Sequence, residues 1–166
     1  MYLPRKQFKK KLKCDRIRNV GSLYLDFKVT KKQQNMFLKN IDSLPTLTTL
    51  TIDCWISVRM MSEMMNLLVD QVKEVDFGCC ALTTPSQGVA VCMSIINCQS
   101  LKLEKLSHNT WIILCDLVDE ETLAKTIIRT KDVDLSGPLL MTKQAEAILT
   151  EIRDSSEVRL STINYK

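Results

Sequence analysis

The feature that most constrains the fold of this chain is a short pattern that occurs six times along it. The six segments align on one template, which has apolar residues at its first, fourth and sixth places. At the fourth and sixth places Glu104 is the one residue that is not large and apolar. The copies read VGSLYLDFKVT from Val20, LTTLTIDCWIS from Leu47, VKEVDFGCCAL from Val72, LKLEKLSHNTW from Leu101, TKDVDLSGPLL from Thr130 and SSEVRLSTINY from Ser155. A repeat of this length indicates an array of similar structural units.

Each unit is expected to contain one strand and one helix. The alternation within each copy is typical of a short strand with one buried face. Thr84-Pro85 has the composition of a helix N-cap followed by proline in the first turn, and apolar residues recur at helical spacing after it. We expect helices near residues 31–44, 58–70, 85–98, 112–128 and 141–153. One such unit cannot bury its apolar faces alone, so the pattern predicts stacked units that form a solenoid.

The template resembles the leucine-rich repeat, with its LxxLxLxxN/CxL core, in the ribonuclease-inhibitor-like subclass that also occurs in nucleotide-binding, leucine-rich-repeat immune receptors. The best copy is VKEVDFGCCAL followed by TTPSQGVAVCMSII, in which Cys80 occupies the Asn/Cys place, as Asn109 does in the next copy. The other copies have Lys28, Trp55, Pro138 and Ile163 there. The resemblance implies an α/β solenoid over residues 20–166, with parallel strands on the concave side and helices on the convex side. It would contain five full repeats and a terminal half repeat, preceded by a basic cap or tail over residues 1–19.

Charge is distributed unevenly along the chain. Residues 1–40 contain twelve Lys and Arg against two Asp, whereas residues 41–166 contain eleven against seventeen Asp and Glu. A basic segment of this kind can bind nucleic-acid phosphate, lie on an anionic membrane, or simply be solvated as a capping element. The nucleic-acid hypothesis would use Arg5, Lys6, Lys9, Lys10, Lys11 and Lys13.

The sequence favours an intracellular protein without catalytic function. It contains no run of eighteen apolar residues, and basic residues occupy the place of a signal core near the N-terminus. The seven cysteines are odd in number and lack the spacing of a disulfide framework. His108 is the one histidine, and the phosphate-loop, dinucleotide and zinc-protease motifs are absent. We therefore expect no enzyme activity and no cofactor.

Two of the cysteines are candidate metal ligands. Cys54, Cys79 and His108 share the eighth place of three consecutive copies, so stacking would bring them into one column. Zinc prefers four ligands, and no fourth ligand lies in that column, where the other copies have Phe27, Gly137 and Thr162, so we expect no metal site. The small size of cysteine predicts core positions for Cys80, Cys92, Cys98 and Cys115, and the thiols should be reduced and mostly buried.

The strand face is the strongest candidate for function. In such a stack the fifth and seventh places point away from the core, and a rigid curved sheet offers a broad binding platform. The acidic side chains of Asp26, Asp53 and Asp76 would suit a basic partner. We expect a protein-protein interaction module of regulator or adaptor type. Its partner-binding residues are expected to be Tyr24, Asp26, Thr51, Asp53, Asp76, Lys105, Asp134 and Arg159.

The last copy reaches Lys166 without a following helix or a capping repeat. The strand expected over residues 157–162 would then be an open edge beside an apolar end face. Such an edge invites self-association or a covering partner, and the chain would be a fragment, a short isoform or a protein completed by a partner.

Overall fold

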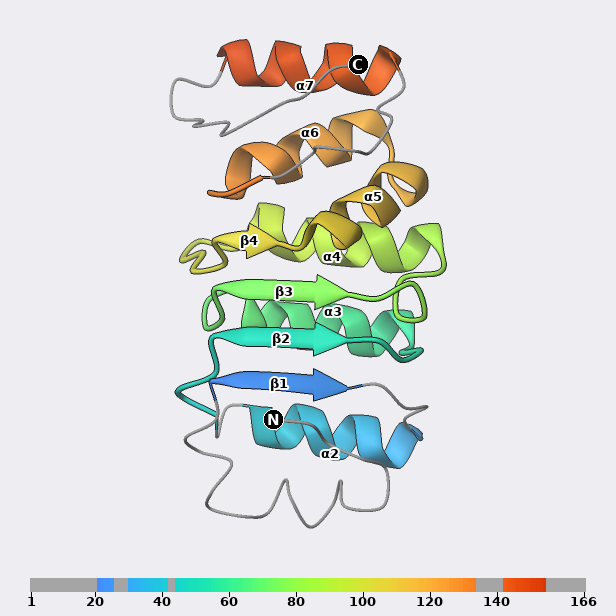
Figure 1. Ribbon diagram of the computed structural model, residues 1–166, viewed down its shortest axis with the longest axis vertical. Coiled ribbons are helices and arrows are strands. Elements are labelled where there is room, and N and C mark those ends of the chain that lie inside the picture. The colour runs from blue at the N-terminus through green and yellow to red at the C-terminus, as the bar shows by residue number, and fades with distance from the viewer. Residues whose placement is uncertain (1–20, 26–29, 42–43, 134–141, 155–166) are drawn as a thin grey trace.

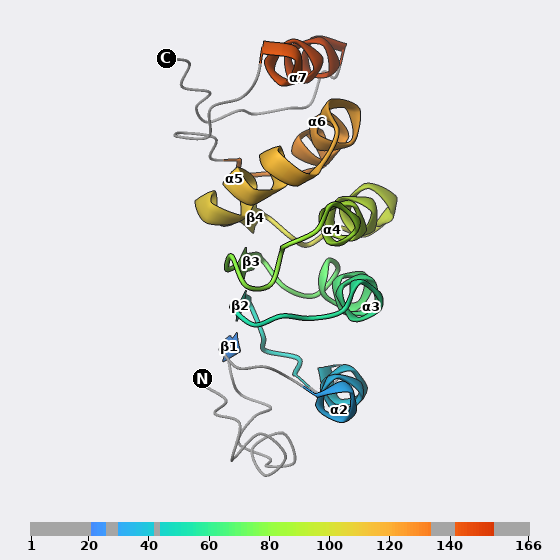
Figure 2. The same cartoon turned by 90° about the vertical axis from the view of Figure 1, so that its right-hand side faces the viewer.

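The computed structural model describes residues 21–25, 30–41, 44–133 and 142–154, and within them the protein is α/β. Four parallel strands form one sheet in the order of the sequence (Figure 1). They are β1 (Ser22–Leu25), β2 (Thr49–Ile52), β3 (Glu74–Phe77) and β4 (Lys105–Leu106). The helices are α2 (Lys31–Ile41), α3 (Val58–Leu68), α4 (Pro85–Asn97), α5 (His108–Leu117), α6 (Glu120–Arg129) and α7 (Thr142–Asp154). Figure 2 shows α2, α3 and α4 on one side of the sheet, which leaves the other sheet face uncovered by them.

The alternation within each copy decides which side chains enter the core. In the first three strands the fourth and sixth template places are all at most 2% exposed, as the repeat predicts. Leu23, Leu50 and Val75 lie opposite one another in the sheet register. In each of these strands the residue at the fifth place, between the two buried residues, points to the open face. Burying one such Leu or Val side chain stabilises the fold by roughly 1.5–3 kcal/mol, so a one-residue slip of register would be costly.

The fourth copy has a different register from the one its sequence suggests. Leu106, and not Glu104, lies opposite Val75, and Lys105 lies opposite Glu74. The main chain repeats the same arrangement in each unit: the Thr48 carbonyl accepts from the N–H groups of residues 73 and 74, and the Lys73 carbonyl from those of residues 104 and 105. Glu104 is therefore equivalent to Lys73, at the second place, where a half-exposed charge is acceptable. The copy begins at Leu103, two residues later than predicted.

The single helix expected over residues 112–128 is replaced by two helices, α5 and α6. Helix α5 begins directly after the short strand β4, with Ser107 as its N-cap. Helix α6 begins after a second N-cap, Asp119, whose side chain accepts from the Thr122 N–H at 2.9 Å. Two capping residues within one apolar segment start two helices, since each satisfies N–H groups that a continuous helix would bond internally.

Helix α4 follows its predicted boundaries closely. Thr84 and Gln87 form a capping box, and Pro85 lies in the first turn. The buried Gln87 side chain also donates to the Ile56 carbonyl at 2.6 Å, which connects α4 to the loop before α3. Helix α3 buries its apolar stripe of Met60, Met61, Met64, Met65 and Leu68 against the same core.

The fifth copy is described only in part. Asp132 forms an isolated parallel bridge with Lys105, and Val133 is buried. The N-terminal segment 1–19, residues 134–141 and the expected strand 157–162 lie outside the described residues. Among the described helices, none combines the length and the apolar composition that crossing a membrane requires.

Candidate functional site

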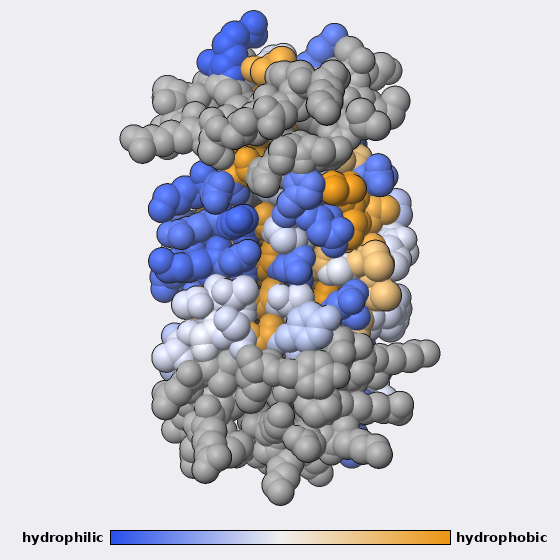
Figure 3. All heavy atoms as spheres, viewed as in Figure 1, coloured by the Kyte–Doolittle hydropathy of each residue, from blue (hydrophilic) through white to orange (hydrophobic). Residues whose placement is uncertain are grey.

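The open sheet face presents two rows of side chains that cross the strands. One row contains Ser22, Thr49, Glu74 and Lys105, and the other contains Tyr24, Thr51 and Asp76. Tyr24 is 36% exposed and is the largest side chain in these rows. Figure 3 views this face and shows strongly hydrophilic residues gathered over the amino ends of β3 and β4. The two outward rows are therefore polar, and charged residues are concentrated at the amino ends of β3 and β4.

The structure brings together part of the predicted partner-binding set. Tyr24, Thr51 and Asp76 lie side by side in one row, as expected from the repeat. Lys105 belongs to the neighbouring row instead, because of the changed register of the fourth copy. Asp53 lies beyond the carboxyl end of β2. Asp26, Asp134 and Arg159 lie outside the described residues, as do the basic residues Arg5, Lys6, Lys9, Lys10, Lys11 and Lys13.

The carboxyl half of the face is closed at β3 by the beginning of α5. The Phe77 N–H donates to Thr110 Oγ1 at 2.8 Å, and Asn109 Nδ2 donates to the Phe77 carbonyl at 3.0 Å. Ser107 Oγ donates to Asp76 Oδ1. Side chains of the first turn of α5 thus replace the main-chain bonds that a longer β4 would have made to β3. This contact engages one oxygen of the Asp76 carboxylate within the protein.

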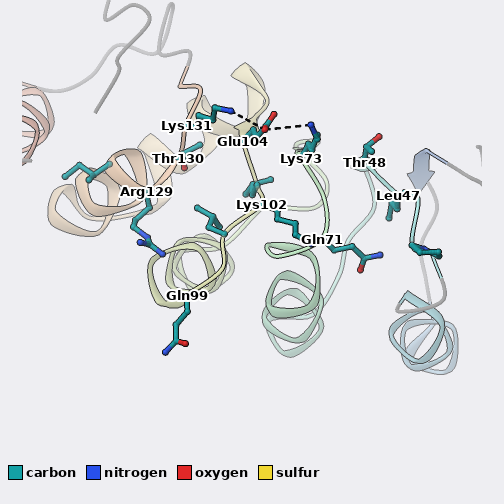
Figure 4. A pocket seen from close by; sticks show the side chains of 14 residues that line it. Leu47, Thr48, Gln71, Lys73, Gln99, Lys102, Glu104, Arg129, Thr130 and Lys131 are labelled. Carbon is teal, nitrogen blue, oxygen red and sulfur yellow. Dashed lines mark hydrogen bonds and ion pairs between the residues drawn. The ribbon is translucent and has the colours of Figure 1, made fainter. Parts of the chain in front are cut away.

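A groove runs along the amino ends of the strands, and sequence reasoning did not find it. Its volume is about 840 Å³ (Figure 4). Of its lining residues four are cationic and one is anionic. They are Lys73, Lys102, Arg129 and Lys131, with Glu104. Since these residues come from three neighbouring copies, the groove is a property of the stack. The register predicted for the fourth copy placed Glu104 within the strand. In the structure Glu104 lies in line with Lys73 and Lys131, so the predicted register could not indicate the groove.

Two ion pairs organise the centre of this groove. Glu104 Oε1 lies 3.8 Å from Lys73 Nζ and 3.3 Å from Lys131 Nζ. Arg129 donates to the Cys98 carbonyl, which holds its guanidinium at the groove wall. Lys102 is exposed. One carboxylate is thus shared by two ammonium groups, and the groove keeps an excess of positive charge.

A second cluster lies at the opposite, carboxyl ends of β2 and β3. One ligand atom from each of Asp53, Cys79 and Cys80 lies within 4.8 Å of the others. Asp53 Oδ1 is buried and has no hydrogen-bond partner in the part of the chain that the structure describes. The pKa of the Cys80 thiol is raised, chiefly by its hydrogen bond with the Cys79 side chain and then by the charges of Cys79 and Asp53.

The cysteines are therefore arranged differently from the prediction. Cys54, which the stacking argument placed in a column with Cys79 and His108, is buried in the core at 3% exposure. Cys80, expected as a core filler, is exposed, because Ala81 and Leu82 enter the core in its place. Cys92 and Cys115 are buried as expected, and Cys98 is half-buried. Burial raises the pKa of Cys92 to about 11 and that of Cys115 to about 12, which disfavours their thiolates near neutral pH.

The two polar features lie at opposite ends of the same strands. The cationic groove follows the amino ends, the Asp53–Cys79–Cys80 cluster follows the carboxyl ends, and the uncharged row from Tyr24 to Thr51 lies between them. Comparison of the chain with protein-family models, with curated proteins and with solved structures found no match.

Proposed function

We propose that this chain is a leucine-rich-repeat-type solenoid that recognises a partner protein, as an intracellular regulator or adaptor without covalent chemistry. The partner lies on the open strand face and reaches into the groove at the amino ends of the strands. The sheet supports this proposal because its outward rows are polar, regular and uncovered by α2, α3 and α4. Side chains held by a parallel sheet form a rigid platform, so binding orders few of them and costs little conformational entropy.

The observation that carries the proposal is the excess of cations in the groove. Four cationic side chains and a single carboxylate line it. Lys73 and Lys131 share Glu104, which leaves the groove positive. A segment rich in Asp or Glu would complement this potential and would associate faster at low ionic strength. The basic partner expected from sequence is less well supported, because Asp76 is bonded to Ser107 and Asp53 belongs to the thiol cluster.

A selection from a library of random displayed peptides tests this proposal. The selected peptides should share a motif that contains acidic residues, and their affinity should fall as salt is added. Lys102→Glu reverses a charge in the groove and should weaken binding about tenfold or more, since a like charge then faces the acidic segment. Lys39→Glu makes the same change on α2, away from the groove, and should leave binding unchanged.

Three outcomes would count against the proposal. Peptides without acidic residues, or equal binding by the Lys102→Glu and Lys39→Glu variants, would remove the groove from recognition. Tight binding of a mixed-sequence oligonucleotide, with no peptide selected, would favour the nucleic-acid function expected from Arg5, Lys6, Lys9, Lys10, Lys11 and Lys13.

A further inference from the structure

We propose that Asp53, Cys79 and Cys80 form a binding site for a thiophilic divalent cation, with Zn²⁺ as the expected ion. Two thiolates and one carboxylate would bind it, and a fourth position would remain open to water or to a group from another molecule. This site goes beyond partner recognition and does not depend on it. It also differs from the column of Cys54, Cys79 and His108 that the sequence suggested, because Cys54 is in the core.

The distances among the three side chains fit a single ion. Their ligand atoms all lie within 4.8 Å of one another. Zinc binds sulfur at about 2.3 Å and carboxylate oxygen at about 2.0–2.2 Å, so two ligand atoms on one tetrahedral ion are roughly 3.5–3.8 Å apart. Closing the cluster around an ion therefore needs movements of about 1 Å, which side-chain rotation supplies.

The backbone places the two thiols together at the surface. After β3 the chain turns, and the Ala81 N–H donates to the Gly78 carbonyl at 2.9 Å. Cys79 and Cys80 occupy the two positions between these residues and are both exposed. Parallel pairing of β2 with β3 then brings Asp53 beside this turn. Two thiols on a turn and a carboxylate on the neighbouring strand end make a donor set that is open to solvent.

Asp53 supplies the observation that points to a cation. Its Oδ1 atom is buried and lacks a hydrogen-bond partner among the described residues. An unpartnered buried carboxylate oxygen is costly, and the cost disappears when the oxygen binds a cation. A Cβ atom on residue 78 would lie 2.5 Å from Asp53 Cγ, so the absence of a side chain at Gly78 allows the carboxylate to occupy this place.

The negative charges of the three side chains also favour binding of a cation. Thiolates at Cys79 and Cys80 would lie beside each other and beside the Asp53 carboxylate, so three negative groups would repel one another. A divalent cation turns these repulsions into attractions. The soft sulfur ligands select zinc over magnesium or calcium, which prefer sets made of oxygen.

Cobalt titration of the full chain tests the site. The protein is kept reduced and stripped of metal, Co²⁺ is added, and the visible and near-ultraviolet spectra are recorded. We expect thiolate-to-cobalt charge-transfer bands and the ligand-field bands of a four-coordinate ion, saturating at one equivalent and abolished by one equivalent of Zn²⁺. Cys79→Ser and Cys80→Ser should each weaken binding about 100-fold, and Asp53→Asn about tenfold with the thiolate bands retained. Circular dichroism checks that each variant is folded.

Matched cysteine variants make the result decisive. Cys92→Ser and Cys98→Ser remove thiols of α4 and of its C-cap and should leave the spectrum and affinity unchanged. The proposal is wrong if about a tenfold excess of metal produces no thiolate bands, or if the bands survive Cys79→Ser and Cys80→Ser. Reaction of the two thiols with each other to form a disulfide in air, without cobalt or zinc binding in the reduced protein, would equally overturn it. Loss of acidic-peptide binding in Lys102→Glu, with cobalt binding intact, separates this site from the recognition proposal.

Discussion

The carboxylate of Asp53 lies in the space that a side chain on residue 78 would need. A Cβ atom there would be 2.5 Å from Asp53 Cγ and 2.9 Å from Asp53 Cβ, and nearer still to Oδ1. Contacts under 3.0 Å require one of the groups to move. Glycine at this position therefore matters for close approach between β2 and β3, and not for an unusual backbone conformation, because Gly78 lies outside the left-handed region.

Gly78→Ala should destabilise the protein by about 1–3 kcal/mol, the usual cost of overpacking. At a glycine with an ordinary conformation and free space, alanine would instead stabilise by about 0.4–1 kcal/mol. Urea denaturation measures the difference. The double variant Gly78→Ala with Asp53→Ala should recover most of the loss, since it removes Asp53 Cγ and Oδ1. An unchanged midpoint in the single variant would contradict this account.

The thiols should divide into two reactivity classes. Cys79 and Cys80 are exposed and should be alkylated in the native protein, whereas Cys54, Cys92 and Cys115 should react only after denaturant is added. The raised pKa values of about 11 for Cys92 and about 12 for Cys115 add to their protection, because the thiolate is the reactive form. Peptide mass spectrometry after timed alkylation identifies each site. Equal rates for Cys79 and Cys92 would show that the core is open.

Side chains of α5 satisfy main-chain groups of β3, as the next strand does in the other copies. Strand β4 contains two residues, and α5 begins two residues after it. The Asn109 side chain then donates to the Phe77 carbonyl, and the Thr110 hydroxyl oxygen accepts from the Phe77 N–H. A buried peptide group needs such a partner, so these two side chains determine how α5 docks on β3.

Thr110→Val tests this docking directly. Valine has nearly the same shape but cannot accept from the Phe77 N–H, so a buried donor is left unpaired and stability should fall by about 1–3 kcal/mol. Thr126→Val is the control. Thr126 is also buried, but its hydroxyl bonds the Thr122 carbonyl within its own helix and the Cys92 thiol. Valine there leaves no main-chain N–H unpaired, so the loss should be smaller. Equal losses would mean that the bond to Phe77 has no special importance.

The N-cap of α6 should make stability depend on acid pH. Hydrogen bonds from the Thr122 N–H and hydroxyl lower the pKa of Asp119 below its usual 3.8. A lowered folded-state pKa gives stability that is present above the unfolded value and is lost as pH falls through the folded value. Asp119→Asn keeps a capping oxygen without a charge. Thermal unfolding of wild type should therefore lose more stability than this variant below about pH 4, and parallel curves would contradict the assignment.

Across the whole molecule, the sheet carries different chemistry at its two ends. Equivalent places of successive copies are stacked by the parallel register, so residues far apart in the chain form continuous rows. The groove cations come from such a row, from the end of α6 and from the segment before β4. A single charge change in the row should consequently alter the potential of the groove without unfolding any unit.

Glu104→Gln removes the one carboxylate that Lys73 and Lys131 share. Acidic peptides should then bind several-fold more tightly and with a steeper salt dependence, because two ammonium groups are released to the ligand. Stability should change by less than about 1 kcal/mol, since the side chains of Lys73, Lys131 and Glu104 are at least 40% exposed. Glu63→Gln makes the same charge change at the α3 pair with Arg59 and should leave peptide affinity unaltered. Weaker binding by Glu104→Gln would contradict the cationic-groove account.

Local patterns in the sequence determined much of the fold. The alternation of Leu23 with Tyr24 and of Leu50 with Thr51 predicts which side chains face the core, and the structure confirms it. The boundaries of α4 follow from its capping residues, which act within one turn. These features depend on residues close together in the chain, and so the sequence alone is sufficient to predict them.

Tertiary structure decided the register of the fourth copy, the division between α5 and α6, and the composition of both sites. A slip of two residues preserves the alternation of a strand, so Glu104 and Leu106 could each have occupied the place opposite Val75 on local grounds. Main-chain bonds from the neighbouring unit select Leu106 and align Glu104 with Lys73. The cluster of Asp53, Cys79 and Cys80 likewise joins two copies. Such contacts arise only when the units stack, because pairing between strands is a property of neighbours in space and not of neighbours in sequence.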